Sequence, residues 1–385
     1  MDWRLPTVHL PNRRHVSAGT QQTMKMGGVS PLAPIFTPER RVSLCAMTSF
    51  ERLNHRLKGE PVDRPPNFDI FMTFAARRTG RPLRDYYLDY RVLVDANLRV
   101  IDDFQIDIAQ AISDPYRECD DFGAAIDYPE NDLPLCRKHL LAELDDIKKL
   151  PRPTAATGRR MHDRIEAIHL LRKKVGGEVP VMGWVEGALA EAADLRGVSQ
   201  IMLDLTDSPE WMEELLELCT EVGVAFARDQ VAAGADIIGL GDAVASLVGP
   251  KLYRQFALPY EQRIFAAVHE MGALCRLHIC GNTNRIVDAM VESGADIIDL
   301  DFMVDMGAAA AKYDDRVAFC GNFDPVAVML KGTPDQVFDA TRHCMEIGGA
   351  RSISGAGCEI PMLTPVDNLH AQTRALKSIS SCIDG

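Results

Sequence analysis

The sequence lacks several features that would place it in a particular class of protein. No apolar run reaches the ~18 residues needed to span a bilayer, which excludes a membrane-spanning chain. Asp and Glu number 55 against 42 Lys and Arg, and the resulting formal charge of −13 excludes a binder of nucleic-acid phosphates. The ten cysteines do not form the framework of a small disulfide-stapled domain, which favours free or metal-bound thiols in a reducing cytoplasm.

The first 46 residues differ in composition from the rest of the chain. They are rich in Ser, Thr and Gly, are basic, and contain prolines at 6, 11, 31, 34 and 38. They lack the continuous apolar segment of a secretory signal, and their amphipathic pattern is poor for an organelle transit peptide. We expect residues 1–46 to be a disordered extension, or to precede a true start at Met47, with one folded domain over 47–385.

Eight short apolar runs alternate with helical segments in the folded part. Nearly continuous apolar character is typical of buried parallel strands, and we expect them at 67–72, 107–113, 179–185, 236–240, 274–280, 296–300, 317–320 and 352–354. Helices are signalled between them by Ser-Pro or Thr-Pro at 208, 333 and 364, where a capping residue precedes a first-turn proline. A Gly-Ala-Asp-Ile-Ile junction occurs twice, at 234–238 and 294–298.

This alternation predicts an α/β fold, a single distorted (β/α)8 TIM barrel. The charged segment 116–175 is expected to be a helical insertion after the second strand. A doubly wound open sheet is the alternative, but no strand is followed by Gly-x-Gly-x-x-Gly.

Polar side chains collect where the predicted strands end. In TIM barrels this edge carries the catalytic groups, and here it carries Asp114, Trp184, Glu186, Asp242, His278, Cys280, Asp299, Asp301, Asn322, Asp324, Cys358 and Glu359. Helix capping would explain any one of the carboxylates. The convergence of the whole set on one edge favours a functional site.

His278 and Cys280 share one face of their strand because they are two residues apart. With Cys358 from another strand they would supply three ligands to zinc and leave the fourth tetrahedral position open, as in catalytic zinc sites. Such a soft centre suits a thiolate or an ether oxygen. Cys320, in a similar Cys-Gly-Asn sequence, is expected in the core and is the alternative to Cys358. Arg276 lies two residues before His278 and therefore faces the same side of the strand, and the sequence does not identify a residue that would neutralise its charge.

With these residues in view, the chain from Thr48 onwards resembles the uroporphyrinogen decarboxylase superfamily, and within it the zinc-dependent, corrinoid-protein-linked methyltransferases. The matching segments are 242–246, 259–260, 277–282, 321–325, 357–361 and 364–368. His-x-Cys and the late Gly-Cys mark the methyltransferase branch, in which they hold zinc. The Arg-Gln-Ala-Gly-Arg-Tyr segment of true decarboxylases is absent, because residues 74–81 read Phe-Ala-Ala-Arg-Arg-Thr-Gly-Arg.

The resemblance implies transfer of a methyl group between a small substrate and the cobalt of a corrinoid. We favour a methoxylated aromatic, with methylamines or methylthiols as rivals. The predicted zinc ligands are His278, Cys280 and Cys358, and catalysis is assigned to Asp242, Glu186 and Glu359. Substrate contacts are assigned to Trp184, Asp114, Asn322 and Asp301.

The partners of the chain also follow from the resemblance. The sequence contains no Asp-x-His-x-x-Gly, so a separate protein should supply the corrinoid. We expect a cytoplasmic enzyme, which could form a homodimer. Two alternatives stay open: a uroporphyrinogen decarboxylase without metal, and a non-catalytic zinc barrel in which Asp301 or Cys320 provides a fourth ligand.

Overall fold

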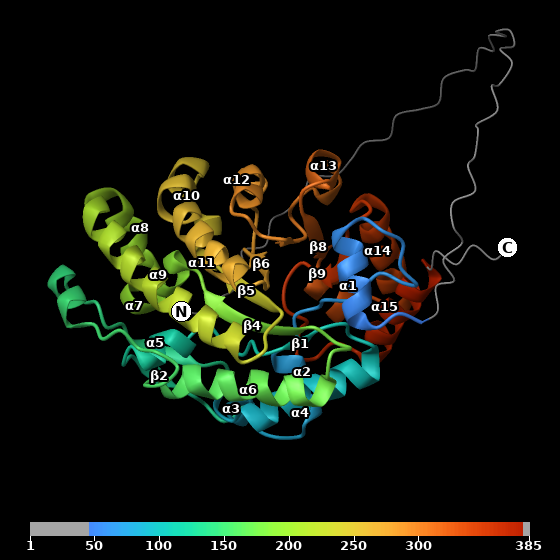
Figure 1. Cartoon of the computed structure of the whole chain (residues 1–385), viewed down its shortest axis with the longest axis horizontal. Helices are drawn as coiled ribbons and strands as arrows, with labels where there is room; N and C mark the ends of the chain where they lie inside the picture. The colour runs from blue at the N-terminus through green and yellow to red at the C-terminus, as the bar shows by residue number, and fades with distance from the viewer. Residues whose placement is uncertain (1–45, 380–385) are drawn as a thin grey trace, which may run out of the picture. The chain divides into compact units, whose positions relative to one another are not determined.

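The structure is a computed structural model, and it describes residues 46–379 (Figure 1). The predicted disordered extension therefore lies almost entirely outside the described residues and stays a prediction. The described chain opens with α1 (Ser49–Leu57), whose capping box the sequence signalled. Thr48 Oγ1 accepts the Glu51 N–H at 3.1 Å, and Glu51 Oε2 accepts the Thr48 N–H at 2.8 Å.

Seven parallel strands form one curved sheet in the order β1-β4-β5-β6-β7-β8-β9. Each overlaps a predicted apolar run, and nearly all of their residues are buried. Their bounds are β1 (Ala109–Gln110), β4 (Val181–Glu186), β5 (Ile237–Gly241), β6 (Leu274–His278), β7 (Ile297–Leu300), β8 (Ala318–Phe323) and β9 (Ile353–Ala356).

The eighth position of the ring is an extended segment around Asn67. Asn67 forms a parallel bridge with Ser354 of β9, and the Phe68 N–H donates to Ser354 O at 2.8 Å. On its other side, Asn67 O accepts the Asp107 N–H at 2.9 Å, just before β1. The preceding Pro65 and Pro66 have no N–H to donate to a ladder, which keeps this strand short. The predicted distorted (β/α)8 barrel is thus confirmed.

Helices surround the sheet on its outer side (Figure 1). The longer ones are α4 (Tyr90–Phe104), α6 (Arg159–Val175), α9 (Pro209–Ala232), α11 (Leu258–Glu270), α14 (Pro334–Ile347) and α15 (Val366–Ser378). Shorter ones are α2 (Thr73–Arg78), α3 (Leu83–Leu88), α7 (Ala188–Arg196), α8 (Val198–Asp207), α10 (Pro250–Phe256), α12 (Val287–Glu292) and α13 (Met306–Tyr313). Helix α9 starts at the predicted Pro209, and α14 starts with a capping box between Thr333 and Gln336.

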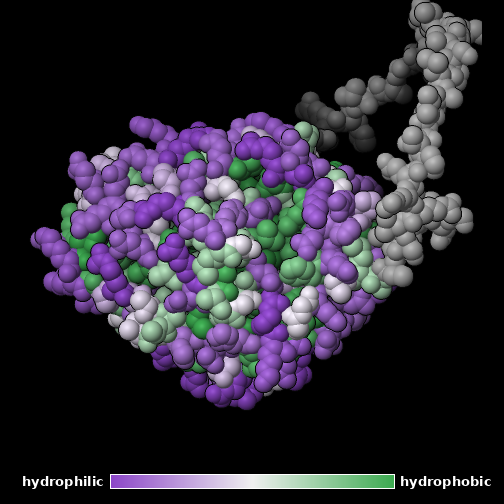
Figure 2. Space-filling model, viewed as in Figure 1, coloured by the Kyte–Doolittle hydropathy of each residue, from purple (hydrophilic) through white to green (hydrophobic). Residues whose placement is uncertain are grey.

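The outer helix faces are mostly polar. Figure 2 shows a predominantly hydrophilic surface on the viewed side, with hydrophobic residues gathered mainly in its central part. None of the helices between residues 46 and 379 combines the length and apolar character required to cross a membrane. Arg56 Nε of helix α1 donates to Ser352 O, just before β9, at 3.0 Å. Helix α1 therefore lies beside the last strand, and both ends of the described chain meet near α14 and α15 (Figure 1).

The segment 116–175 is only partly helical, which corrects the prediction of a helical insertion. It contains α5 (Arg117–Asp121), the antiparallel pair β2 (Ala125–Asp127) and β3 (Leu135–Lys138), the 3-10 helix η1 (Leu144–Lys149) and α6. The hairpin escaped prediction because its strands have three and four residues, too few to reveal an alternating pattern. Helix α6 packs against β4 and belongs to the barrel itself.

Candidate metal centre and active site

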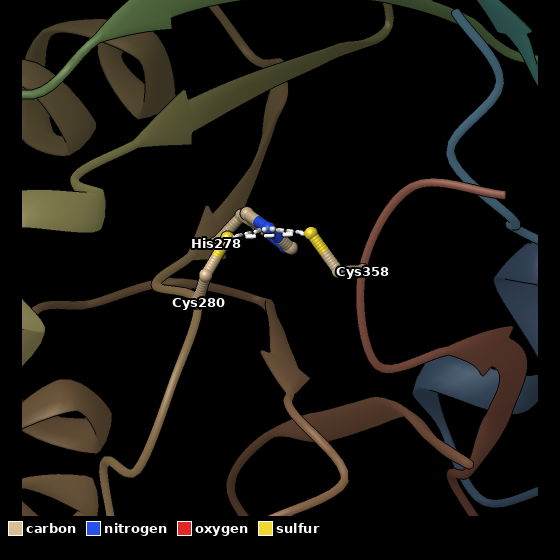
Figure 3. A group of neighbouring side chains, drawn as sticks. All are labelled: His278, Cys280 and Cys358. Carbon is tan, nitrogen blue, oxygen red and sulfur yellow. Dashed lines mark hydrogen bonds between the residues drawn. The ribbon is translucent and has the colours of Figure 1, made fainter. Parts of the chain in front are cut away.

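Three metal-binding side chains meet at the carboxyl end of the barrel (Figure 3). His278 ends β6, Cys280 follows it, and Cys358 comes from the loop after β9. His278 Nε2 lies 2.9 Å from Cys280 Sγ and 3.7 Å from Cys358 Sγ, and the two sulfurs are 3.4 Å apart. Tetrahedral zinc, with bonds of about 2.3 Å to sulfur and 2.0 Å to nitrogen, would separate its ligand atoms by ~3.5–3.8 Å. The distance between Cys358 and His278 matches this spacing and the other two are shorter, so the three donors lie close enough together to share one zinc ion.

A turn at Gly281 directs Cys280 towards His278. Gly281 has φ +95°, a left-handed conformation that glycine adopts without strain. Its N–H donates to Asp301 Oδ2 at 2.8 Å, which ties the turn to the loop after β7. Hydrogen bonds with Cys280 and His278 hold the pKa of Cys358 well below its usual value, so this sulfur is prepared to bind a metal as thiolate.

Asp299 fixes the orientation of the imidazole. Its Oδ2 lies 2.8 Å from His278 Nδ1, which leaves Nε2 to face the two sulfurs. Arg276 Nε donates to both Asp299 oxygens, at 2.9 and 3.1 Å. Burial alone would raise the pKa of Asp299, but Arg276 and His278 hold it below its usual value. Asp299 is thus the counter-charge of Arg276 that the sequence did not reveal.

A cavity of about 170 Å³ opens beside the three donors. Seven of the predicted site residues line it: Asp114, Trp184, Glu186, His278, Cys280, Cys358 and Glu359. The sequence did not single out its apolar wall, formed by Ile70, Met72, Ile112 and Pro115, or the buried guanidinium of Arg117. Arg117 lies in the insertion, where no strand end or motif marked it.

Two glycines make room for the Trp184 side chain in this cavity. Trp184 pairs in register with Gly239 of β5, and a Cβ on Gly239 would clash with the indole ring. A Cβ on Gly241 would stand 3.1 Å from the same ring. The indole centroid lies 6.2 Å from that of His278, so Trp184 forms an apolar wall next to this imidazole.

Two carboxyl groups that line the cavity have raised pKa values. Burial, with a contribution from Glu118, raises the pKa of Glu186 to about 8, although Arg117 Nη2 donates to Glu186 Oε1 at 2.6 Å. Burial raises the pKa of Glu359 to about 7, and Glu359 Oε1 accepts the Thr73 N–H and Oγ1–H, both at 2.7 Å. Both groups can hold a proton near neutral pH.

Asp114 has the opposite electrostatic environment. Burial would raise its pKa, but the guanidinium of Arg160, 2.6 Å from Oδ2, lowers it to about 2, with help from Arg117. Arg160 lies in α6 and is fully buried. Asp114 is therefore a permanent carboxylate, matched by a permanent cation.

Three predicted residues do not line the cavity. Asp242 is fully buried and lies against Gly187, where helix α7 starts. Asp301 accepts the Gly281 N–H, and Asn322 Nδ2 donates to Asp301 O at 3.0 Å and to Val304 O at 2.8 Å. Their contacts position neighbouring loops and a helix, and a role for any of them in chemistry or substrate binding stays a prediction.

Cys320, the alternative ligand, lies outside the group of three donors. Its Sγ is 3.7 Å from both Arg276 Nη2 and Ser354 O, and its exposed fraction is 1%. Among residues 46–379, the group of ligand atoms that lie within 4.8 Å of one another around His278 contains only Cys280 and Cys358 besides it. The predicted assignment of Cys320 to the core agrees with this placement.

Comparison with known proteins places this geometry in a family. The family described as uroporphyrinogen decarboxylase (URO-D) matches residues 48–379. The methylcobamide:CoM methyltransferase MtbA of Methanosarcina acetivorans is 30% identical over 340 residues, which cover 86% of this chain and 98% of the relative. A uroporphyrinogen decarboxylase of Xanthomonas campestris is 27% identical over 313 residues, covering 76% of this chain and 85% of that protein.

A solved structure agrees with the sequence comparison. A methyltransferase from Methanosarcina mazei superposes with a TM-score of 0.79 at 26% identity, covering 86% of this chain and 99% of that one. The predicted resemblance is thereby confirmed. The chain belongs to the uroporphyrinogen decarboxylase family and is an enzyme of its corrinoid-dependent methyltransferase branch.

Proposed function

We propose that this enzyme moves a methyl group between a small substrate and the cobalt of a corrinoid protein, with zinc held by His278, Cys280 and Cys358. The observation that carries the proposal is the set of one imidazole and two thiol donors, 2.9–3.7 Å apart, on the wall of a cavity. When bound, zinc would act as a Lewis acid that stabilises negative charge on the substrate heteroatom. Three protein ligands leave a position for that atom.

The residues around the donors have distinct tasks in this proposal. Asp299 holds the His278 ring so that Nε2 stays aimed at the metal position. Trp184, Ile70 and Met72 exclude water from the reacting groups. Glu186 and Glu359 are the carboxyl groups that can exchange a proton inside the cavity. Asp242 packs against Gly187 at the start of α7, behind the cavity wall.

The substrate we favour is a methoxylated aromatic compound. A cavity of about 170 Å³ is close in size to the roughly 150 Å³ that holds a benzene ring. The indole of Trp184 and the aliphatic side chains give one side of it the apolar character that an aromatic ring requires. Asp114, held as a carboxylate by Arg160, adds a polar contact for ring substituents.

A thiol or thioether is the second candidate. Two thiolate ligands make the site soft, which favours a sulfur ligand at the open position. The relative from M. acetivorans is named for transfer between a methylcobamide and CoM. Binding assays with a thiol and with a methoxylated benzene on the same zinc-loaded protein separate the two candidates.

The remaining alternatives have weaker support. A porphyrinogen is far larger than a cavity of about 170 Å³, and residues 74–81 lack the arginine segment that grips its carboxylates. A purely structural zinc site requires four protein ligands. Neither Asp301 nor Cys320 belongs to the group of ligand atoms that lie within 4.8 Å of one another, so neither is placed to close the site.

The proposal includes a separate corrinoid protein, because the sequence has no Asp-x-His-x-x-Gly segment. We place the enzyme in the cytoplasm and consider a homodimer compatible with it. The carboxyl ends of the strands, where the three donors lie, are the surface on which the corrinoid must approach.

Metal analysis tests the centre of the proposal. We expect about one zinc per chain, lost in Cys280→Ser and in Cys358→Ser because each removes one of three ligands. Cys320→Ser is the matched control, since this thiol is buried nearby but lies outside the donor set. Full zinc in Cys358→Ser would contradict the proposal. A second assay adds a corrinoid protein and follows the methylation of cobalt by its absorption spectrum.

A further inference from the structure

The loop that carries Cys358 is held by residues 69–73, which lie far away from it in the sequence. This segment follows Asn67, the eighth position of the ring, and ends at Thr73, the first residue of α2. Asn67 pairs with β9, and Cys358 comes directly after β9. Residues 69–73 therefore run alongside the loop on one side of it.

Hydrogen bonds join the two segments on both sides of Cys358. Before it, the Ala356 N–H donates to Asp69 Oδ1 at 2.8 Å. After it, the Ile360 N–H donates to Ile70 O at 2.9 Å. Cys358 thus projects towards the other two donors from a short loop whose two ends are fixed to the same neighbouring segment (Figure 3).

Glu359, the residue directly after Cys358, has two bonds to a single residue of this segment. Its Oε1 accepts both the N–H and the Oγ1–H of Thr73, each at 2.7 Å. Thr73 is only 9% exposed, so water has little access to replace these bonds. A fixed Glu359 side chain restricts the backbone from which the Cys358 sulfur projects.

The other side of the loop faces β8, the second neighbour of β9 in the sheet. The Gly357 N–H donates to Phe323 O at 2.9 Å. A Cβ on Gly357 would stand 2.6 Å from the backbone nitrogen of Phe302, so the loop after β7 passes close by. The Cys358 loop is therefore enclosed between this backbone and residues 69–73.

The other two donors are supported from β7 and the loop that follows it. Asp299 orients the imidazole donor, and Asp301 accepts the N–H of the turn at Gly281. Such outer contacts hold the ligands of a metal site in place, and their loss lowers metal affinity. The contacts of residues 69–73 are the corresponding support for Cys358.

We propose that Thr73 is a positioning residue that holds Cys358 at the metal position, with Asp69 as the second such residue. The inference rests on the proposed function, because it requires Cys358 to bind zinc. Thr73 acts through Glu359: its hydroxyl fixes that side chain, which limits how far the loop can move from the other donors. Without the hydroxyl, Cys358 should be the first of the three donors to leave zinc.

Thiol labelling of zinc-loaded protein tests this role without turnover. Zinc-bound thiolates are protected from iodoacetamide, so initial labelling rates report how often each sulfur leaves the metal. The tryptic peptides 277–285 and 352–374 contain one cysteine each, Cys280 and Cys358, and mass spectrometry measures both in one sample. Thr73→Val should raise the ratio of Cys358 to Cys280 labelling by about 10–100-fold. A loosened fold would instead raise both rates together.

Three further variants separate the hydroxyl from other effects, with circular dichroism to confirm folding. Thr73→Ser keeps the hydroxyl and should restore the labelling ratio of the parent protein. Thr364→Val is the matched control, since Thr364 is also buried but its hydroxyl has no hydrogen-bond partner among residues 46–379. Asp69→Ala removes the acceptor of the Ala356 N–H, so it should raise the same ratio independently of Thr73.

The inference is overturned if Thr73→Val and Asp69→Ala bind zinc and keep the labelling ratio of the parent protein. An equal rise in Thr73→Ser and Thr73→Val also overturns it, because the hydroxyl would then not be responsible. Asp69→Ala decides the matter if Thr73→Val does not fold. A parent protein without zinc, or one in which zinc does not protect Cys358, contradicts the proposed function itself, and the inference falls with it.

Discussion

Replacing Asp299 with Asn should weaken zinc binding, although Asp299 is not itself a ligand. In the parent protein the carboxylate accepts a hydrogen bond from His278 Nδ1 at 2.8 Å and is held by Arg276 Nε at 2.9 and 3.1 Å. The amide keeps the size of the side chain but loses the negative charge that makes the imidazole a stronger ligand. Removing such a partner of a ligating histidine usually costs 10–100-fold in affinity, or ~1.4–2.7 kcal/mol.

The same substitution has a separate cost for folding. Arg276 is 2% exposed and loses its counter-charge, while its Nη2 keeps the 3.0 Å bond to Phe68 O. Breaking one partner of a buried pair costs about 3–5 kcal/mol, a large part of the ~5–15 kcal/mol that stabilises a typical domain. Urea denaturation should therefore show a lower midpoint for Asp299→Asn, and zinc affinity must be measured where the variant is still folded.

Competition with a chelator of known zinc affinity measures the effect, with circular dichroism to confirm folding. Asp296→Asn is the matched control. Asp296 Oδ2 also lies 2.9 Å from a histidine nitrogen, that of His269, but at the opposite end of β6 and β7. We expect 10–100-fold weaker zinc in Asp299→Asn and no change in Asp296→Asn. Unchanged zinc affinity in folded Asp299→Asn would refute the role assigned to this carboxylate.

Two further predictions concern the walls of the cavity. Gly239→Ala should lower the free energy of unfolding by about 1–3 kcal/mol, because its Cβ would clash with Trp184. Gly249→Ala is the control and should leave the free energy of unfolding nearly unchanged, since no atom lies within 4 Å of that Cβ. Thermal denaturation and Trp fluorescence measure both variants. Asp114 has a pKa of about 2 against an ordinary value of 3.8, so its carboxylate should add roughly 2 kcal/mol to the free energy of unfolding above pH 4. This contribution should be lost as the pH falls towards 2. Urea midpoints from pH 6 to pH 3 should therefore fall more for the parent protein than for Asp114→Asn, and parallel curves would contradict this.

The barrel was predictable because its strands are buried on both faces. A run such as 236–240 is apolar after its first residue, and seven such runs became strands of one sheet. The eighth run, 67–72, contributed a single bridge at Asn67, because apolar character does not show where strand pairing begins and ends, and the two prolines before the run cannot donate to a ladder. The hairpin β2–β3 was missed since its seven residues carry no periodicity.

The candidate metal centre was predictable from parity and from the edge at which strands end. His278 ends β6 and Cys280 lies two residues further on, just beyond the strand, while Cys358 follows β9, so the topology brings them together. The groups that tune the centre were not predictable. Arg117 and Arg160 come from the insertion and from α6, and only the folded chain shows that they face Glu186 and Asp114.

X-ray absorption at the zinc edge tests the central claim most directly. For purified protein we expect one zinc per chain with two sulfur ligands near 2.3 Å and one imidazole nitrogen near 2.0 Å, plus one exchangeable light-atom ligand. Cys320→Ser should give the same spectrum. A protein without bound zinc, or a spectrum with two sulfurs that survives Cys358→Ser, would contradict a metal centre built from His278, Cys280 and Cys358.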